Sequence, residues 1–398
     1  MSIGDLAGWL VDQSERRPAL PELFEGFCQR LNGMGLDLWR AVLGLETLHP
    51  EVSGSMLRWN AGTLTKTVRD RVNVATSEAY LRSPTKIVDD TARPFRWRAG
   101  QDMAGMPQLE ELAAEGVTDY LMLPLPFLDS TRTAVVSYAT RAADGFGPAQ
   151  VELLRAAAHL LSPWAERAIL RRIATDLLAA YLGPRSGRLA YDGQIERGDV
   201  HTIHAALWCC DLRGFTALSD RLPRTKLVAI LNRWFDVIGA AIEAGGGEIL
   251  KFMGDGLLAV FPLEGEGAST CDRALEAAEQ AVAGSRALDG LLAQKGEPPL
   301  RFGLALHVGD VEYGNIGTRQ RLDFTVIGPA VNMASRLEGL TKELGVTAVA
   351  SADFASRTSR GLPSLGEHRL RGIAAPVEVF GLLQPEPRAL RPSSSIRS

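Results

Sequence analysis

Residues 209–216 read Cys-Cys-Asp-Leu-Arg-Gly-Phe-Thr and close an apolar, strand-like run that begins at Ala205. Residues 251–256 read Lys-Phe-Met-Gly-Asp-Gly and join two further strand-like runs. Asp211 and Asp255 therefore each stand at the end of a predicted strand, followed or flanked by glycine. Two carboxylates placed in this way can hold a divalent cation such as Mg²⁺, which prefers oxygen ligands.

The rest of the second half alternates strand and helix patterns. Strands are expected at residues 205–210, 248–252, 257–261, 301–308, 311–314, 324–327, 346–350 and 377–383, and helices around 227–238, 271–292 and 330–344. This order predicts an α+β sandwich in which helices cover one sheet, and it places Asp255 in a hairpin turn.

The first half reads as a separate, small α/β domain. An amphipathic helix is expected from Leu20 to Leu31, followed by short strands at 36–45, 56–59, 120–127 and 134–138. A helical stretch over 148–182, broken near Pro163, carries an apolar seam at its end that pairs with its twin in a dimer or packs on its own domain. The seam consists of Leu170, Ile173, Leu177 and Ala180.

A chain of 398 residues exceeds the usual size of one domain. The predicted division is a sensor domain over 1–165, a helical linker and connector over 166–200, a catalytic domain over 201–384 and a disordered tail over 385–398. The connector proper, 183–199, is rich in Gly, Arg and Pro.

Composition excludes several classes of function. The chain has 43 Lys plus Arg against 47 Asp plus Glu, so its net charge of -4 provides no general attraction for nucleic acid. No apolar run approaches the roughly 18 to 20 residues that span a bilayer, and no leader pattern is visible, so we expect a cytoplasmic protein without a membrane span. The four cysteines lack CxxC spacing and predict neither a disulfide framework nor a zinc site.

A third motif lies downstream, where residues 331–338 read Val-Asn-Met-Ala-Ser-Arg-Leu-Glu. Asn332 and Arg336 are four residues apart and share one face of a predicted helix, where they could grip a polyphosphate. Each motif has an ordinary alternative: an aspartate beside glycine is a common turn residue, and Asn332 and Arg336 could belong to a solvated helix face.

In their order and context, these motifs resemble those of the class III adenylyl and guanylyl cyclases, which make cyclic nucleotides from nucleoside triphosphates. The resemblance covers residues 202–383 and includes residues 308–317, Val-Gly-Asp-Val-Glu-Tyr-Gly-Asn-Ile-Gly, and 323–336, Asp-Phe-Thr-Val-Ile-Gly-Pro-Ala-Val-Asn-Met-Ala-Ser-Arg. It implies the ferredoxin-like, palm-type fold of that family for the catalytic domain.

The resemblance also implies roles for individual residues. Two Mg²⁺ or Mn²⁺ ions per site would be bound by Asp211, Asp255 and the backbone carbonyl of Leu212. Substrate and transition-state contacts would come from Gly214, Phe215 and Thr216 against the triphosphate, Asn332 at the ribose, Arg336 at the reacting phosphorus and Arg371 near the leaving phosphates. For Arg371, an ordinary solvated arginine is an equal alternative.

Base choice in the family rests on two positions that correspond to Lys251 and Thr325. Lysine donates to adenine N1 and a threonine hydroxyl accepts from the exocyclic amine, whereas guanine presents the reverse pattern. The expected activity is therefore an adenylate cyclase, a homodimer with shared active sites and ATP as substrate. The alternatives are a non-enzymatic nucleotide-binding signalling module and a phosphohydrolase, although no water-activating base is evident.

In the first half, residues 119–170 resemble the end of a GAF-type sensor domain. The resemblance rests on Leu-Met-Leu-Pro-Leu at 121–125, a strand at 133–138 and Gly-Phe-Gly at 145–147 before a long helix. It implies a regulator, a small molecule or a protein of unknown identity, that acts at the N-terminal domain.

Overall fold

The computed structural model describes residues 2–46, 52–70, 77–103, 105–128, 133–263 and 267–382. The chain divides into two compact units, Met1–Ala180 and Tyr181–Ser398. Within the described ranges, no helix has the length and apolar character needed to cross a membrane.

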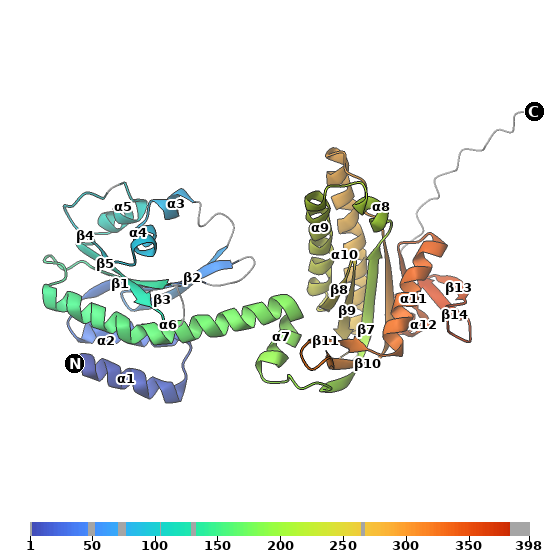
Figure 1. Ribbon diagram of the computed structural model, residues 1–398, viewed down its shortest axis with the longest axis horizontal. Helices are drawn as coiled ribbons and strands as arrows, with labels where there is room; N and C mark the ends of the chain where they lie inside the picture. Colours follow the sequence, from blue (N-terminus) through green and yellow to red (C-terminus); the bar gives the residue numbers. More distant parts are fainter. Residues whose placement is uncertain are drawn as a thin grey trace, which may run out of the picture. The chain divides into compact units, whose positions relative to one another are not determined.

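An antiparallel sheet of order β3-β2-β1-β6-β5-β4 forms the centre of the first unit (Figure 1). Its strands are β1 (Leu38–Glu46), β2 (Val52–Asn60), β3 (Thr63–Asp70), β4 (Phe95–Arg98), β5 (Asp119–Pro126) and β6 (Thr133–Thr140). Its helices are α1 (Ile3–Arg16), α2 (Leu20–Gly33), α3 (Glu78–Leu81), α4 (Pro84–Thr91), α5 (Pro107–Ala114) and α6 (Pro148–Leu182).

The two faces of this sheet bury different side chains, because successive strand residues point to opposite sides. Ala41 and Leu43 of β1 pack with α1, α2 and α6 in the larger core. Tyr120 and Met122 of β5 lie on the other face, under α4 and α5. The α1 helix and the edge strands β3 and β4 were not predicted; β3 alternates exposed threonine, lysine and valine, which gives little apolar signal.

The α6 helix runs unbroken through Pro163, so the predicted break was wrong. Proline removes one N–H and the bond that it would make to the carbonyl four residues earlier. Pro163 and His159 are both exposed, so water can satisfy that carbonyl, while buried Leu161 and Ala165 hold the helix on the sheet. Tertiary packing here outweighs the local preference.

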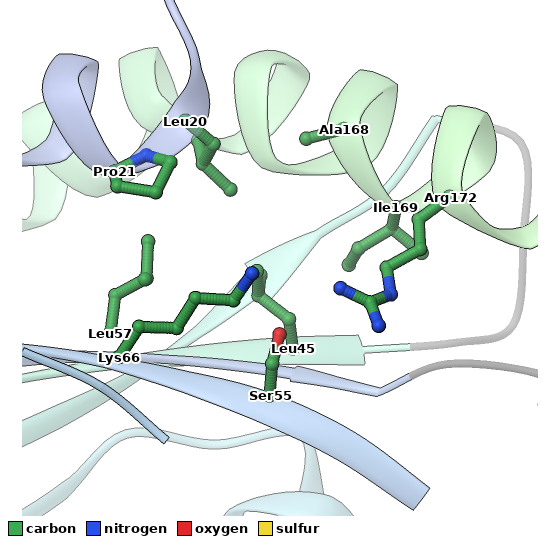
Figure 2. Close-up of a pocket in the computed structure, with 9 residues that line it drawn as sticks. All are labelled: Leu20, Pro21, Leu45, Ser55, Leu57, Lys66, Ala168, Ile169 and Arg172. Carbon is green, nitrogen blue, oxygen red and sulfur yellow. The ribbon is translucent and has the colours of Figure 1, made fainter. Parts of the chain in front are cut away.

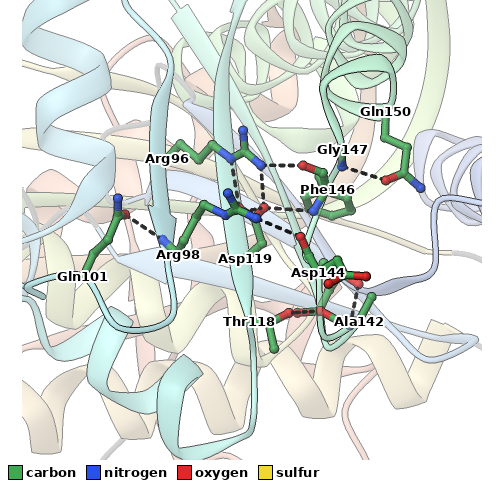
Figure 3. A network of polar contacts seen from close by, with 11 residues as sticks. Arg96, Arg98, Gln101, Thr118, Asp119, Ala142, Asp144, Phe146, Gly147 and Gln150 are labelled. Atoms are coloured by element: carbon green, nitrogen blue, oxygen red, sulfur yellow. Dashed lines mark hydrogen bonds and ion pairs between the residues drawn. The ribbon is translucent and has the colours of Figure 1, made fainter.

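A buried carboxylate ties the loop before α6 to the sheet (Figure 3). The Asp119 side chain has no solvent exposure and accepts two bonds from Arg96, at 3.1 and 2.6 Å, and one from the Phe146 N–H at 2.9 Å. Gly145 has φ of 65°, and a Cβ there would lie 2.6 Å from the Asp119 carboxylate. The Gly-Phe-Gly sequence therefore fits a turn wrapped around a charge.

The second unit is built on a sheet of order β13-β14-β12-β10-β7-β9-β8, with β11 paired to β10. The strands are β7 (Val200–Leu212), β8 (Glu248–Met253), β9 (Gly256–Pro262), β10 (Phe302–Gly317), β11 (Leu322–Ile327), β12 (Ala348–Ser351), β13 (Ser364–His368) and β14 (Val377–Gly381). The helices are α7 (Pro184–Tyr191), α8 (Phe215–Ser219), α9 (Arg224–Ala244), α10 (Gly267–Gln294), α11 (Pro329–Leu344) and α12 (Ala352–Ala355). The α+β arrangement predicted for this half is confirmed.

Helices pack on both faces of this sheet. Trp208 and Cys210 of β7 lie in a core with α9 and α10, whereas Ala205, Leu207 and Cys209 face the side of α11. The two strands predicted at 301–308 and 311–314 are one continuous strand, β10, because β7 pairs with it from Phe302 to Gly314.

Part of the predicted connector is a helix. In α7, Ser186 is fully buried, and its backbone N–H and hydroxyl both donate to the Glu248 carboxylate at 3.1 Å. Tyr313 donates to the same carboxylate at 3.2 Å and lies 2.9 Å from the Ser186 hydroxyl. These contacts are long-range in sequence, so local composition could not predict them.

Removal of the Asp119 carboxylate should destabilise the first unit. In Asp119→Ala, we expect the free energy of unfolding to fall by about 2 kcal/mol, because Arg96 and the Phe146 N–H lose a charged acceptor while Arg96 stays partly solvated. Chemical denaturation of the two proteins measures the difference. Asp90→Ala, which removes only an exposed helix pair with Lys86, should change stability by less than about 0.5 kcal/mol; equal effects of the two substitutions would contradict the assignment.

Candidate active site

Strand pairing brings the two aspartates of the opening motifs together. Asp211 lies at the end of β7, directly opposite Gly256 of β9, and Asp255 occupies the turn that joins β8 to β9, as predicted. A Cβ at position 256 would lie 2.7 Å from the Asp211 Oδ1 atom and 2.6 Å from the Cys210 carbonyl oxygen. Glycine after Asp255 is therefore required for the close approach of the turn to β7.

The electrostatics of the pair favour a bound cation. Burial raises the pKa of Asp211, and the negative charge of Asp255 raises it further. Burial also raises the pKa of Asp255. Two half-buried carboxylates that lack a compensating positive charge can be neutralised by a divalent ion, which the oxygen ligands suit.

The pair is open rather than enclosed. Among the described residues, no group of three or more His, Cys, Asp or Glu side chains is arranged to cage a metal ion. Hard cations bound by one or two carboxylates usually complete their shell with water and substrate phosphates. The residues present thus fit an ion that is shared with a phosphate-bearing ligand.

Glu338 of α11 is a third carboxylate near this pair, and the sequence reasoning missed it. Burial raises its pKa to about 7, with a further contribution from Asp211, while the Arg213 charge opposes the shift. A Cβ at Gly303 would lie 2.4 Å from the Glu338 carboxylate, so a glycine on β10 makes room for it. The available signal was its position four residues after Ala334, on the buried face of the helix.

The turn after Asp211 exposes backbone donors. Gly214 adopts φ of 73° and ψ of 21°, a left-handed conformation that favours glycine, and caps the short helix α8. The first N–H groups of that helix, at Phe215 and Thr216, have no partner within the helix. Arg213 points elsewhere, since its guanidinium donates to the Val346 carbonyl.

Lys251 and Thr325 lie on neighbouring strands of the same chain, because β8 contacts β11. Thr325 is only 4% exposed, and its hydroxyl has no hydrogen-bond partner among the described residues. Lys251 is half-buried on the edge strand. A buried hydroxyl without a hydrogen-bond partner lowers the stability of the fold, unless a bound ligand supplies that hydrogen bond.

Asn332 and Arg336 occupy the first turns of α11, with Asn332 exposed and Arg336 half-buried. The guanidinium lies beside Gly372, at 3.4 Å from where a Cβ would be, and exposed Arg371 precedes that glycine. Within the described part of the chain, no hydrogen bond or ion pair joins Asn332 or Arg336 to Asp211 or Asp255. Asn332 and Arg336 are therefore not tied to the two aspartates of their own chain by direct polar bonds.

Comparison with known proteins shows what residues 202–380 are similar to. They match the family model described as the adenylate and guanylate cyclase catalytic domain. An adenylate cyclase of Anabaena cylindrica is 35% identical over 158 residues, which are 38% of this chain and 30% of the relative. Adenylate cyclase 1 of Rhizobium meliloti is 28% identical over 178 residues, 43% of this chain and 26% of the relative.

The chain thus spans less than a third of the length of these two curated relatives. Among solved structures, the guanylyl cyclase Cya2 aligns with a TM-score of 0.42 and 27% identity, over 48% of this chain and 97% of that protein.

The raised pKa of Glu338 predicts a pH dependence of stability in the metal-free protein. An acid whose pKa rises on folding binds its proton more tightly in the folded state, so stability falls as pH rises from about 4.5 to about 7 and is constant above that range. Glu338→Gln removes this loss. In the presence of a chelator, we expect the variant to be more stable than wild type at pH 8 by on the order of 1 kcal/mol, with a smaller gap at pH 5.

Denaturant titrations at the two pH values measure the gap. Glu343→Gln on the same helix, which removes a solvent-facing acid, serves as the control and should show little change with pH. A gap of the same size at pH 5 and pH 8 would contradict the assigned shift.

Proposed function

We propose that this chain, which carries an adenylate and guanylate cyclase catalytic domain over residues 202–380, converts ATP to 3',5'-cyclic AMP and pyrophosphate. The observation that carries the choice of ATP is the buried, unpartnered hydroxyl of Thr325 on the strand that neighbours Lys251. The main alternative is a signalling module that binds nucleotide without turnover.

Class III cyclases generally depend on divalent metal, and the donor set here fits that need. Asp211, Asp255 and the Leu212 carbonyl would hold two Mg²⁺ or Mn²⁺ ions. When bound, such ions make the ribose 3'-hydroxyl more acidic and stabilise the leaving phosphates. The raised pKa of Asp211 supports this role, because a cation would relieve the repulsion from Asp255 that causes part of the shift.

The other residues would position the substrate. The backbone at Gly214, Phe215 and Thr216 offers donors to the triphosphate at a strand-to-helix turn. Arg336 would neutralise charge that develops at the α-phosphorus, and its planar guanidinium suits a phosphoryl group. The set is completed by Asn332 at the ribose and by Arg371 near the leaving phosphates.

Lys251 and Thr325 would read the adenine base. The lysine ammonium donates to N1, and the threonine hydroxyl accepts from the exocyclic amine. Guanine places an N–H and a carbonyl at these two positions. The lysine would then face a donor, which disfavours GTP, although a hydroxyl can also donate and soften the discrimination.

Cyclase catalytic domains use nucleotide substrates and dimerise, and we propose that this chain forms a symmetric homodimer with two shared sites. Among the described residues, no hydrogen bond or ion pair joins Asn332 or Arg336 to the aspartates of its own chain. In a two-fold dimer, the carboxylates of one subunit can face the Asn332 and Arg336 of its partner, and each site is then complete.

We propose that the first half is a GAF-like sensor that biases the population of competent dimers. Its output passes through α6 and α7. The buried cluster of Ser186, Glu248 and Tyr313 fixes α7 to the first residue of β8, the strand that carries Lys251. A shift of α7 would therefore displace one side of the base pocket.

Product analysis tests the activity and the base choice together. With purified protein, Mn²⁺ and either ATP or GTP, chromatography should show cyclic AMP formed faster than cyclic GMP, and Lys251→Glu with Thr325→Cys should lower that ratio by about tenfold or more. Lys295→Glu, an exposed lysine outside the pocket, should leave it unchanged. ADP as the product would support a phosphohydrolase, and an unchanged ratio in the double variant would show that these residues do not read the base.

Mixed dimers test the shared site. Asp255→Ala and Arg336→Ala should each be nearly inactive as homodimers, but random subunit exchange at equal concentrations makes about half the dimers mixed, each with one intact site. Activity should then recover to roughly a quarter of wild type by this symmetry argument. Absence of recovery despite exchange demonstrated by differently tagged subunits would mean that each chain builds its own site.

A further inference from the structure

The first unit contains a small apolar slot between the sheet and α6, about 140 Å³ in volume (Figure 2). Strands β1 to β3 form its floor, α6 its wall and the first turn of α2 its end. Its lining consists of Leu20, Pro21, Leu45, Ser55, Leu57, Lys66, Ala168, Ile169 and Arg172. The slot lies on the opposite side of the sheet from α3, α4 and α5.

The charge of the slot has one sign. Among the described residues, Lys66 and Arg172 are its only ionisable lining residues, and Figure 2 shows both reaching toward the end occupied by Leu45 and Ser55. Arg172 donates through Nε to Asp176 at 3.3 Å, which leaves its terminal nitrogens for another acceptor. The Lys66 ammonium makes no hydrogen bond or ion pair among the described residues.

The size of the slot limits what it can hold. A dry cavity of about 150 Å³ accommodates a benzene molecule. The apolar lining of Leu20, Leu45, Leu57 and Ile169 suits a hydrocarbon body of that size. The uncapped start of α2 adds a weakly positive helix terminus at the same place.

A larger cavity of about 540 Å³ lies on the other face of the sheet. Its lining is not of one charge sign, because Arg40 and Arg58 lie beside Asp89 and Glu111. Arg40 is already paired to Glu115 at 2.6 Å. Charge complementarity therefore favours an anion in the smaller slot.

We propose that this slot binds an organic monocarboxylate whose apolar body has about six to eight atoms, such as an aromatic acid or a medium-chain fatty acid. The body occupies the space among the leucines, and the carboxylate accepts from Lys66 and Arg172. Such a ligand bridges the sheet to α6 at Ile169, which is the last buried residue of the helix. It would therefore stiffen the helix that leaves the first unit.

Isothermal titration of the full chain with benzoate, hexanoate and benzamide tests the proposal without any cyclase assay. We expect saturable binding of at least one of the two carboxylates. Tighter binding of benzoate would indicate an aromatic acid as the ligand, and tighter binding of hexanoate would indicate a fatty acid. Benzamide, a neutral analogue of benzoate, should bind at least about tenfold more weakly than the preferred acid. Equal affinity for benzamide, or no saturable binding of either acid, would overturn the proposal.

Variants locate the binding. Lys66→Gln and Arg172→Gln should each lower the affinity for the preferred acid by about tenfold. Ala168→Phe should abolish binding by filling the slot. Arg58→Gln, which removes a cation from the larger cavity, is the matched control and should bind like wild type. Thermal melts verify that each variant folds. Retained binding in both Ala168→Phe and the Lys66 and Arg172 double variant, or loss in Arg58→Gln alone, would place the ligand elsewhere and refute the slot.

Discussion

The antiparallel pairing of β7 with β9 is the constraint on which the candidate active site of the second unit depends. This register sets Asp211 opposite Gly256 and thereby holds the turn that carries Asp255 against the end of the central strand. The same strand pairs with β10 along its whole length, so the carboxylates stand on a rigid floor. The strand pairing thus fixes Asp211 directly, and it fixes Asp255 through the short turn between β8 and β9.

The negative charge at this end of the sheet is compensated only in part, by the Arg213 charge that opposes the rise in the pKa of Glu338. Asp211, Asp255 and Glu338 gather at one end of the sheet, and burial raises the pKa of each; repulsion from a neighbouring carboxylate raises the pKa of Asp211 and of Glu338 further. Burial thus makes the charged forms of these acids less favourable in the folded protein than in water. Acids whose pKa values are shifted in this way are common at functional sites.

In the first unit, by contrast, a buried carboxylate has its hydrogen-bond partners within the protein. Asp119 is fully enclosed but satisfied by Arg96 and a backbone N–H, and it fixes the turn from which α6 begins. At the other end of the segment formed by α6 and α7, the Ser186 hydroxyl of α7 donates a hydrogen bond to the Glu248 carboxylate of β8. Both ends of the helical connection are thus anchored to their own sheets by charged hydrogen bonds, which are among the stronger ones available to a protein.

The sequence alone predicted the α+β character of the second half, the placement of Asp211 at a strand end and of Asp255 in a turn, and the candidate site residues Lys251, Thr325, Asn332 and Arg336, because periodicity and motif order are local properties of the chain. Local patterns did not predict that the α6 helix continues through Pro163, that residues 184–191 form α7, or that residues 63–70 form the edge strand β3. Contacts with residues distant in the sequence decide the structure of these segments. Only the tertiary structure revealed Glu338 beside Asp211, the orphan hydroxyl of Thr325 and the slot against α6. Burial and electrostatic coupling depend on which residues become neighbours in space, and no local pattern encodes that.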